Sequence, residues 1–251
     1  MPIKMRIHAA NTKEDTTEEG DDIKGEAARA RAVGKERDAA ILDLIQRCKY
    51  ISRDQVQAML FGHAYRQKCC ERLTKLYRAG KVSRKRVEAS RPFIYFPAGV
   101  RWNQKVEHYL TLNWVYISLK KQIKSWFKLH VFDREHFCKW DDGHLLADAL
   151  VVLKNTAIKK LHPVFVEIDR GQSNNRFDKV LKYTDYYRSK AWVHEWWAQP
   201  DQESRYRFPK VLVVTDRSEL VQKVIDRENG AGIRFIVLPE VDIMKDIYSF
   251  I

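Results

Sequence analysis

Three acidic side chains interrupt or end apolar stretches that are typical of buried β-strands. Asp148 lies inside LLADALVVL (145–153), and Glu167 and Asp169 end HPVFVEID (162–169). Because side chains alternate along a strand, Glu167 and Asp169 are expected on one face. An ionised carboxylate among apolar neighbours is costly unless a cation compensates it. The pattern predicts a metal site with Asp148, Glu167 and Asp169 as ligands.

Magnesium is the ion that best fits such a site, with manganese as its substitute. Magnesium takes oxygen ligands, usually one or two carboxylates together with waters and substrate phosphate. Such an ion can polarise a phosphodiester and activate water for its cleavage. The alternative is structural: the acids pair internally, for instance with Arg170 or Lys179, and hold no metal.

A helix expected over residues 175–190 follows the acids and carries a basic and aromatic stripe. Arg176, Lys179, Tyr183, Tyr186 and Lys190 form this stripe, opposite a core face of Phe177, Val180, Leu181, Thr184 and Arg188. A stripe of this kind can grip phosphates or stack on exposed bases. Alternatively, it is a solvated face whose tyrosines cover the sheet edge.

The elements that must position these residues predict an α/β domain over residues 101–251. A helix over 103–123 precedes an alternating strand at 124–132 and apolar strands at 145–153, 162–168 and 210–216, and a further helix (218–226) and strand (233–238) complete the chain. Near-continuous apolar strands indicate a sheet covered by helices on both faces. We expect this sheet to be mixed.

The first hundred residues predict a different module. Residues 1–34 are polar and are expected to form a flexible arm that becomes helical near GEAARARA (25–32). A first helix is expected to begin at Lys35, a second to follow the N-cap Ser52, and a third to span residues 65–80. The third helix is expected to bury Tyr65, Cys69, Leu73 and Leu76. Two β-prone runs, 81–87 and 91–97, follow. This order is typical of a winged helix-turn-helix, which we predict over residues 35–100.

In a winged helix the third helix enters the major groove and the wing anchors phosphates. The alternative is a three-helix interaction module with a solvated basic face. The residues predicted to contact DNA are Arg66, Gln67, Lys68, Thr74 and Arg78 on the helix, Arg84, Lys85, Arg86 and Arg91 on the wing, and Arg176 and Tyr183 in the second domain.

Composition and charge limit the classes of molecule that the protein is expected to bind. A net charge of +13 over 251 residues favours a polyanion, and double-stranded DNA is the leading candidate. No apolar run approaches the roughly 18 residues that cross a bilayer, and the acidic start lacks a secretory signal, so we expect a cytoplasmic protein without membrane association. The four cysteines show no zinc spacing and are expected to be reduced. Pairing into a homodimer is possible, as in many winged helices.

Other reaction types lack their residues. The eight histidines form no His-hydrophobic-His pair, and the sequence has neither a GxxxxGK[ST] loop nor a GxSxG elbow. His144, just before the Asp148 strand, is a candidate participant, although a lone histidine is more often structural.

The acids resemble those of the PD-(D/E)XK nuclease core, in which an acid on the second strand and an acid-x-lysine on the third coordinate metal; Asp148 and Glu167 match the acids. A winged helix, then HYLTLN (108–113), ADALVVL (147–153), FVEIDRGQ (165–172) and KVLKYTDYY (179–187), more narrowly resembles the replication-relaxation family of plasmids and mobile elements, over roughly residues 36–217. The resemblance implies a DNA-binding factor in replication or DNA processing, with replication proteins as partners and a magnesium-dependent endonuclease or nickase activity.

The chain departs from the nuclease pattern at Asp169, where the pattern has lysine. A lysine there would orient the attacking water and stabilise developing charge. Lys179 or Lys182, from the next helix, could replace it, with Asp169 acting as a third ligand or a base. The alternative is a non-catalytic DNA-binding regulator of replication or transcription that retains a degenerate nuclease fold.

Overall fold

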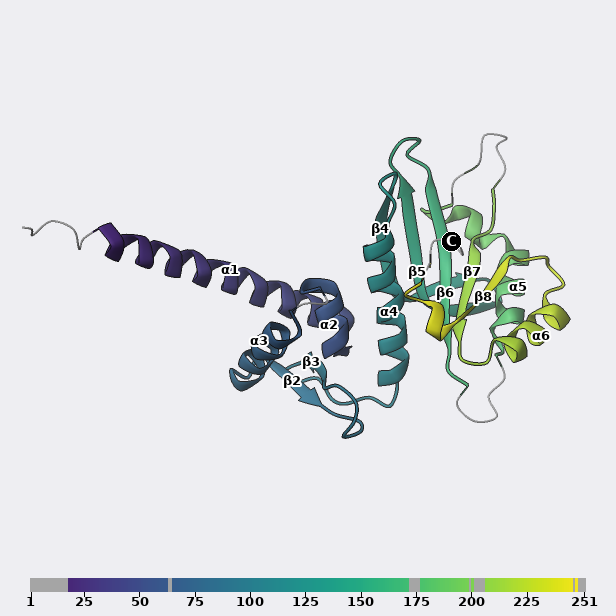
Figure 1. Cartoon of the computed structure of the whole chain (residues 1–251). Helices are drawn as coiled ribbons and strands as arrows, with labels where there is room; N and C mark the ends of the chain where they lie inside the picture. Colours follow the sequence, from purple (N-terminus) through teal and green to yellow (C-terminus); the bar gives the residue numbers. More distant parts are fainter. Residues whose placement is uncertain are drawn as a thin grey trace, which may run out of the picture.

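The computed structural model describes residues 18–62, 65–171, 177–198, 200, 206–245 and 247, with side chains from Ala32 onward. This part of the chain holds six α-helices and two β-sheets (Figure 1). None of the described helices is long and apolar enough to cross a bilayer.

The N-terminal module contains the three predicted helices and the predicted hairpin. Its helices are α1 (Glu18–Cys48), α2 (Arg53–Leu60) and α3 (Arg66–Arg78). Strands β1 (Ile51–Ser52), β2 (Val82–Lys85) and β3 (Ile94–Pro97) form an antiparallel sheet in the order β1-β3-β2. We did not predict β1, because two residues are too few to show a period. The predicted cap is confirmed: the Ser52 hydroxyl accepts from the Gln55 backbone N–H at 3.2 Å.

Two local expectations in this module are corrected. Helix α1 begins at Glu18, not near Lys35, so the expected arm is helical from Glu18 on; residues 1–17 lie outside the described part. Alanine has the highest helix propensity, and arginine and glutamate follow closely, which explains a helix through this run. Tyr65 is 53% exposed, not buried, because it is the N-cap of α3 and lies ahead of the core-facing turn.

Helix α4 (Val106–Gln122) lies between the N-terminal module and the larger sheet (Figure 1). On the module side, the Asn113 side-chain amide donates to the Tyr50 carbonyl at 2.5 Å, and the Gln55 amide donates to the Leu110 carbonyl at 2.6 Å. On the other side, the Ser118 hydroxyl donates to the Ile243 carbonyl at 2.6 Å. Buried hydrogen bonds on both sides therefore fix the two halves of the protein relative to one another.

The larger sheet is mixed, as predicted for an α/β protein. Strands β4 (Phe127–Trp140), β5 (Gly143–Asn155), β6 (Leu161–Asp169), β7 (Lys210–Thr215) and β8 (Phe235–Pro239) lie in that order. The β4-β5-β6 pairs are antiparallel, whereas the β6-β7-β8 pairs are parallel. Helices α5 (Lys179–Ser189) and α6 (Ser218–Glu228) cover one face, and α4 covers the other (Figure 1).

Candidate active site

Asp148 lies where strands β5 and β6 separate. The β5–β6 ladder ends at Ala149↔Val166, and beyond it the Asp148 carboxylate accepts the Ile168 backbone N–H at 2.7 Å. The sheet is also irregular here: Ala147 packs under α5 whereas Ala149 packs under α4, and Glu135 on the neighbouring strand has a left-handed φ of 53°. This break in alternation places Asp148 within reach of both covering layers.

Glu167 lies near the end of β6 and is only 1% exposed. Its Oε1 accepts the Tyr183 hydroxyl at 2.6 Å, and its Oε2 accepts from the Lys179 ammonium. Burial, followed by the nearby Asp148, raises the pKa of Glu167 to about 8, against the opposing effect of Lys179 and Tyr183. The carboxyl group is therefore poised to exchange a proton near neutral pH.

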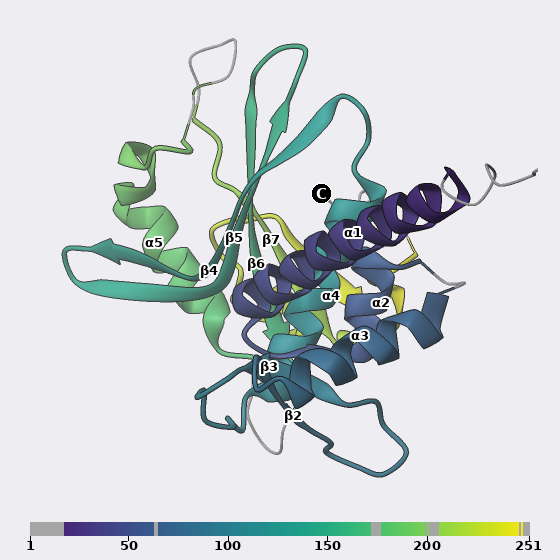
Figure 2. The same ribbon diagram turned by 90° about the vertical axis from the view of Figure 1, so that its left-hand side faces the viewer.

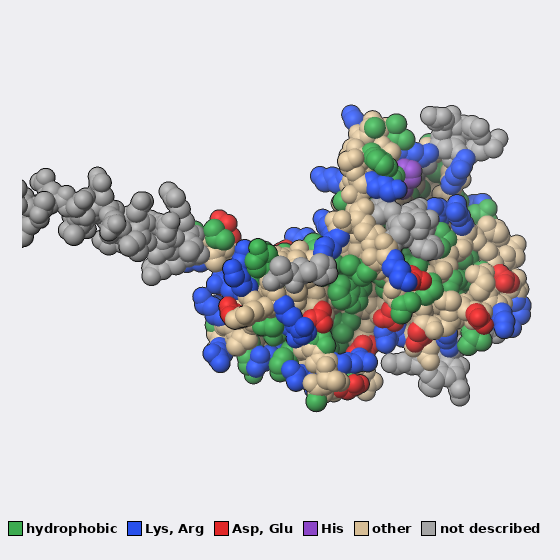
Figure 3. Space-filling model, viewed as in Figure 1, with side chains coloured by type: hydrophobic (Ala, Val, Ile, Leu, Met, Phe, Trp, Pro, Cys, Tyr) green, Lys and Arg blue, Asp and Glu red, His purple; other side chains and the backbone are tan. Residues whose placement is uncertain are grey.

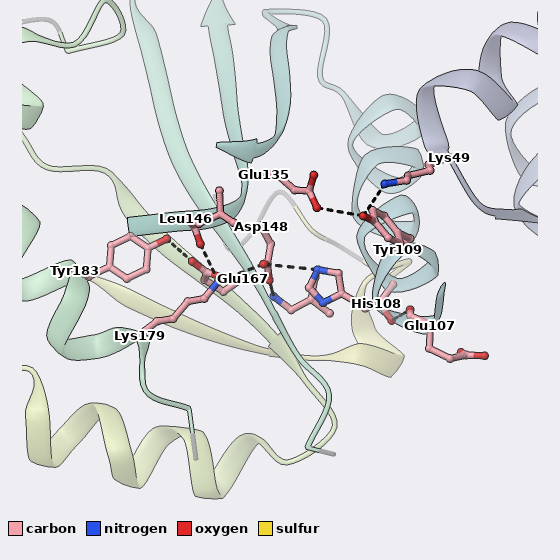
Figure 4. A network of polar contacts seen from close by, with 12 residues as sticks. Lys49, Glu107, His108, Tyr109, Glu135, Leu146, Asp148, Glu167, Lys179 and Tyr183 are labelled. Carbon is pink, nitrogen blue, oxygen red and sulfur yellow. Dashed lines mark hydrogen bonds and ion pairs between the residues drawn. The ribbon is translucent and has the colours of Figure 1, made fainter. Parts of the chain in front are cut away.

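Lys179 joins the two acids from the first turn of α5 (Figure 4). Its Nζ donates to Asp148 Oδ1 at 3.2 Å, to the Leu146 carbonyl at 3.1 Å and to Glu167. Burial alone would lower the pKa of Lys179, but Glu167 and Asp148 outweigh it and raise the pKa. Lys182, the other candidate for this position, is exposed on α5. A lysine from the following helix thus contacts both acids, although strand β6 carries aspartate at the expected lysine position.

A pocket of about 360 Å³ opens beside Asp148, between the start of α4 and the ends of β5 and β6. His108, in the first turn of α4, lines it, and its Nε2 lies 3.6 Å from Asp148 Oδ1. Burial lowers the pKa of His108 despite the opposing effect of Asp148. The sequence predicts no role for His108, and its place in the HYLTLN motif is the signal that could have identified it. His144, the histidine that the sequence offers as a candidate, is exposed and stacks on Phe137 instead.

The same pocket is connected to the N-terminal module by hydrogen bonds. Lys49 donates to the Tyr109 hydroxyl at 3.2 Å, and that hydroxyl donates to Glu135 at 3.1 Å (Figure 4). Tyr109 and Glu135 both line the pocket. These two hydrogen bonds link Lys49 of the module to the pocket wall.

Asp169 does not join the other two acids. Arg217 donates to both of its oxygens, at 2.7 and 2.8 Å, and the Thr215 hydroxyl donates at 2.8 Å. Gly171, with a φ of 54°, makes the turn after β6, where a Cβ would lie 3.1 Å from Arg217. In the described part of the chain, no group of three His, Cys, Asp or Glu side chains could hold a metal ion. The predicted three-carboxylate centre is therefore wrong, because Asp169 is committed to Arg217.

The structure gives Asp169 a role in stability, which a mutation can test. Asp169→Asn should lower the free energy of unfolding by about 1.5–3 kcal/mol, because a two-point hydrogen bond to a charged partner is lost. Burial alone would raise the pKa of Asp169, but hydrogen bonds from Arg217 and Thr215 outweigh it and lower the pKa below its usual 3.8. The stabilisation is therefore complete above pH 3.8 and is lost as the pH falls through the lowered value.

Urea denaturation at neutral and acidic pH measures this effect. Asp185→Asn, at an exposed position on α5, is the matched control. An Asp169→Asn protein as stable as wild type at neutral pH would contradict the structural role.

The predicted basic and aromatic stripe of α5 is not a surface. Tyr183 and Tyr186 are fully buried and pack around Phe165, whereas Leu181, expected in the core, is 53% exposed. Tyr183 therefore cannot stack on DNA bases in this structure, and its hydroxyl instead positions Glu167. The buried side of α5 combines Val180 and Thr184 from the predicted core face with Tyr183 and Tyr186 from the predicted stripe. Arg176 lies outside the described residues.

The predicted DNA contacts of α3 lie on its outer face. Arg66, Gln67, Lys68 and Arg78 are exposed and Thr74 is half-buried. The Gln67 side-chain amide donates a hydrogen bond to Glu71 at 3.0 Å, so part of its hydrogen-bonding capacity is used within the helix. Figure 3 shows Lys and Arg side chains spread over this module, consistent with a basic surface.

The predicted wing residues differ in how exposed they are and in whether they already have partners within the protein. Arg84 stacks between Tyr77 and Phe93, with its guanidinium carbon 4.2 and 4.3 Å from the ring centroids. Lys85 and Arg86 are exposed and lean on Trp102 and Phe93. Arg91 forms ion pairs with Glu107 at 3.0 Å and Glu88 at 3.6 Å, so it ties the hairpin to α4. Its acidic partners make Arg91 a poorer phosphate anchor than predicted.

No family model matches the chain, and no curated protein matches it. Among solved structures, the comparison found protein VC1899 from Vibrio cholerae, at 14% identity and a TM-score of 0.32. The match covers 83% of this chain and 48% of the other, so the chain spans about half the length of that protein. Similarity at this level assigns neither a family nor a function.

Proposed function

We propose that the protein is a metal-dependent DNA endonuclease or nickase, acting in replication or DNA processing of a mobile element. The observation that carries this proposal is the contact of Lys179 with both Asp148 and Glu167. It supplies, from α5, the cation that the nuclease pattern requires beside its two acids. Replication proteins and a second copy of the chain are proposed partners.

The order of elements supports the same assignment. The order of helices α1, α2 and α3 and the β2–β3 hairpin along the chain is the order expected of a winged helix. Helix α4, strands β4, β5 and β6, helix α5 and strand β7 have the order expected of a PD-(D/E)XK-like core. Asp148 lies on the second of these strands and Glu167 on the third, as the pattern requires.

The two acids fit a magnesium or manganese ion that retains water ligands. Magnesium needs only one or two carboxylates when waters and substrate phosphate complete its shell, so Asp148 and Glu167 suffice without Asp169. When bound there, such an ion would polarise the scissile phosphodiester and lower the pKa of the attacking water. The raised pKa of Glu167 makes metal binding compete with a proton below about pH 8.

The other side chains have roles that follow from their contacts. Tyr183 holds Glu167 in place through its hydroxyl hydrogen bond. Lys179 neutralises the acids and places an ammonium group where negative charge develops during phosphodiester cleavage. His108 presents an imidazole nitrogen to the pocket, and its lowered pKa keeps it able to accept a proton near neutral pH.

Nicking of supercoiled plasmid tests the proposed activity. Purified protein should convert it to the open-circular form with magnesium or manganese but not with a chelator. The rate should rise as the pH approaches about 8, because Glu167 must lose its proton to bind the ion. Metal should also raise the melting temperature, since a ligand of the folded state stabilises it. Neither nicking nor a metal-induced shift at any pH would overturn the proposal.

The contribution of the proposed wing, the β2–β3 hairpin, to DNA binding can be tested separately. Replacing Lys85 and Arg86 with alanine should weaken binding to duplexes of any sequence and reduce the salt dependence of log K by about 0.9 per lost phosphate contact. Both side chains are exposed on the β2–β3 hairpin. Lys120→Ala with Lys121→Ala, exposed at the end of α4, removes equal charge as a control. Fluorescence anisotropy across a salt series measures the slope; equal slopes for the two double variants would remove the wing from the interface.

A second candidate is a non-catalytic DNA-binding regulator with the same fold. It is favoured by the internal pairing of all three acids, Asp148 and Glu167 with Lys179 and Asp169 with Arg217. In that case the protein should bind duplex DNA through the wing but neither nick plasmid nor gain stability from metal.

A further inference from the structure

Strands β4 and β5 expose an aromatic and apolar surface close to Asp148. Phe137 is 56% exposed and Leu146 47% exposed, and the two are paired across the strands. The exposed His144 stacks on Phe137 with ring centroids 5.5 Å apart and an interplanar angle of 28°. Phe137, His144 and Leu146 are called the platform below. Large apolar side chains grouped at the surface often mark a binding site.

The platform continues directly into the pocket. His144 and Leu146 are alternate residues of β5 and share one face of that strand, and Asp148 follows them at the break in alternation. Leu146 lines the pocket together with His108 and Asp148, and its carbonyl accepts a hydrogen bond from Lys179. A chain lying on the platform would therefore reach Asp148 next, beside the Lys179 ammonium.

Nothing in the described part of the molecule covers the platform. Helix α4 packs on the same side of the sheet, but against residues farther along β5, such as Val151 and Leu153. The β4–β5 hairpin projects beyond the sheet core, to the left in Figure 2. Its tip lies at residues 141–142, between Trp140 and Gly143. The side chains of the platform are thus accessible.

The chemistry of the surface favours bases that are not paired. Bases stack on flat aromatic side chains regardless of sequence, because every base has a π face. In a duplex the faces of internal base pairs are already stacked on their neighbours, so an aromatic surface cannot use them. Lys139, exposed and paired with His144 across the strands, adds positive charge for the backbone. A protein partner would gain nothing from the adjoining acid–lysine site.

We infer that the platform binds unpaired nucleotides next to a phosphodiester that Lys179 would hold beside Asp148, so that the substrate is single-stranded or locally unpaired DNA. The inference rests on the proposed function for the identity of the adjoining site. Binding to the platform itself needs neither metal nor cleavage.

Binding without metal tests the inference separately from catalysis. Fluorescence anisotropy in a chelating buffer compares a labelled single strand of about 12 nucleotides, within the usual span of single-strand sites, with the corresponding duplex. Phe137→Ala should weaken single-strand binding at least about fivefold, the lower end of what one base–aromatic stack contributes. Duplex binding should change little. Phe137→Tyr keeps an aromatic face and should restore single-strand affinity.

Controls separate the platform from other surfaces. Ile158→Ala removes a side chain that is 67% exposed in the β5–β6 turn and should leave both affinities unchanged. The Lys85 and Arg86 alanine variant should weaken duplex binding more than single-strand binding. Melting temperatures of the Phe137 variants should match wild type, because the side chain is largely exposed.

The outcomes distinguish this inference from the proposed function. Two results would contradict binding of unpaired nucleotides by the platform, even if the plasmid is nicked. One is an equal single-strand affinity of wild type and Phe137→Ala, and the other is an equal loss of affinity for single strand and duplex. A selective single-strand loss in Phe137→Ala would support it. If the same protein never cleaves, the nuclease proposal fails and the binding surface remains.

Discussion

Replacing Lys179 with methionine is expected to lower the plasmid-nicking rate at least about a hundredfold. Removing one preorganised group that stabilises developing charge typically costs a factor of about 10²–10³. The Lys179 ammonium contacts both Asp148 and Glu167, and the lysine side chain is only 24% exposed. Methionine retains most of the volume and apolar length but not the charge.

Lys182→Met is the matched control for this experiment. Lys182 is on the same helix but is exposed, so its loss should leave the rate within about twofold, as is usual for a surface substitution far from the chemistry. Asp148→Asn should reduce nicking as strongly as Lys179→Met, because it removes one of two metal-binding carboxylates. Circular dichroism and melting temperature check that the variants are folded. Wild-type nicking by a folded Lys179→Met protein would contradict the catalytic assignment of this lysine.

Replacing Glu167 with alanine is expected to lower the free energy of unfolding by about 1–3 kcal/mol, the usual cost of leaving buried hydrogen-bond partners without their acceptor. Glu167 is 1% exposed, and its loss would leave the Lys179 ammonium and the Tyr183 hydroxyl without their shared acceptor. Asp185→Ala, at an exposed site on α5, should change stability little. Urea denaturation gives both values. A loss under about 1 kcal/mol would show that the buried pair is not a stabilising contact.

The pH dependence of stability provides a separate signature of Glu167. Its folded-state pKa is raised from 4.5 to about 8, so between these values the folded state holds a proton that the unfolded chain has released. The folded state therefore binds more protons, and the free energy of unfolding falls as the pH rises from 4.5 to about 8. Glu167→Gln should remove this contribution.

The difference between wild type and Glu167→Gln isolates this group from others that titrate in the same interval. Burial also lowers the pKa of His108 and His162, which makes stability rise with pH below their usual 6.5. Those groups are present in both proteins and cancel in the difference. A difference that rises with pH across the interval would contradict the raised pKa of Glu167.

The sequence by itself determined most of the elements of this protein. Near-continuous apolar runs predicted β5, β6 and β7, because a strand buried on both faces has few polar positions. The alternating run 124–132 predicted only the first part of β4, which extends to Trp140. Local signals also located α3, α4 and α6 and the cap at Ser52. Asp148, Glu167 and Lys179 could be selected because a charged group in or beside a buried strand requires a partner, and the next helix offers one.

The tertiary structure alone decided which groups meet. Glu167 and Asp169 share a strand face, as alternation predicts, yet Asp169 binds Arg217, 48 residues later, and leaves the site. His108 reaches Asp148 from α4, and the aromatic core beneath α5 buries Tyr183 against Glu167. Periodicity states which way a side chain points along its own element. Which distant side chain meets it depends on how the elements pack, and that is not encoded in any local pattern.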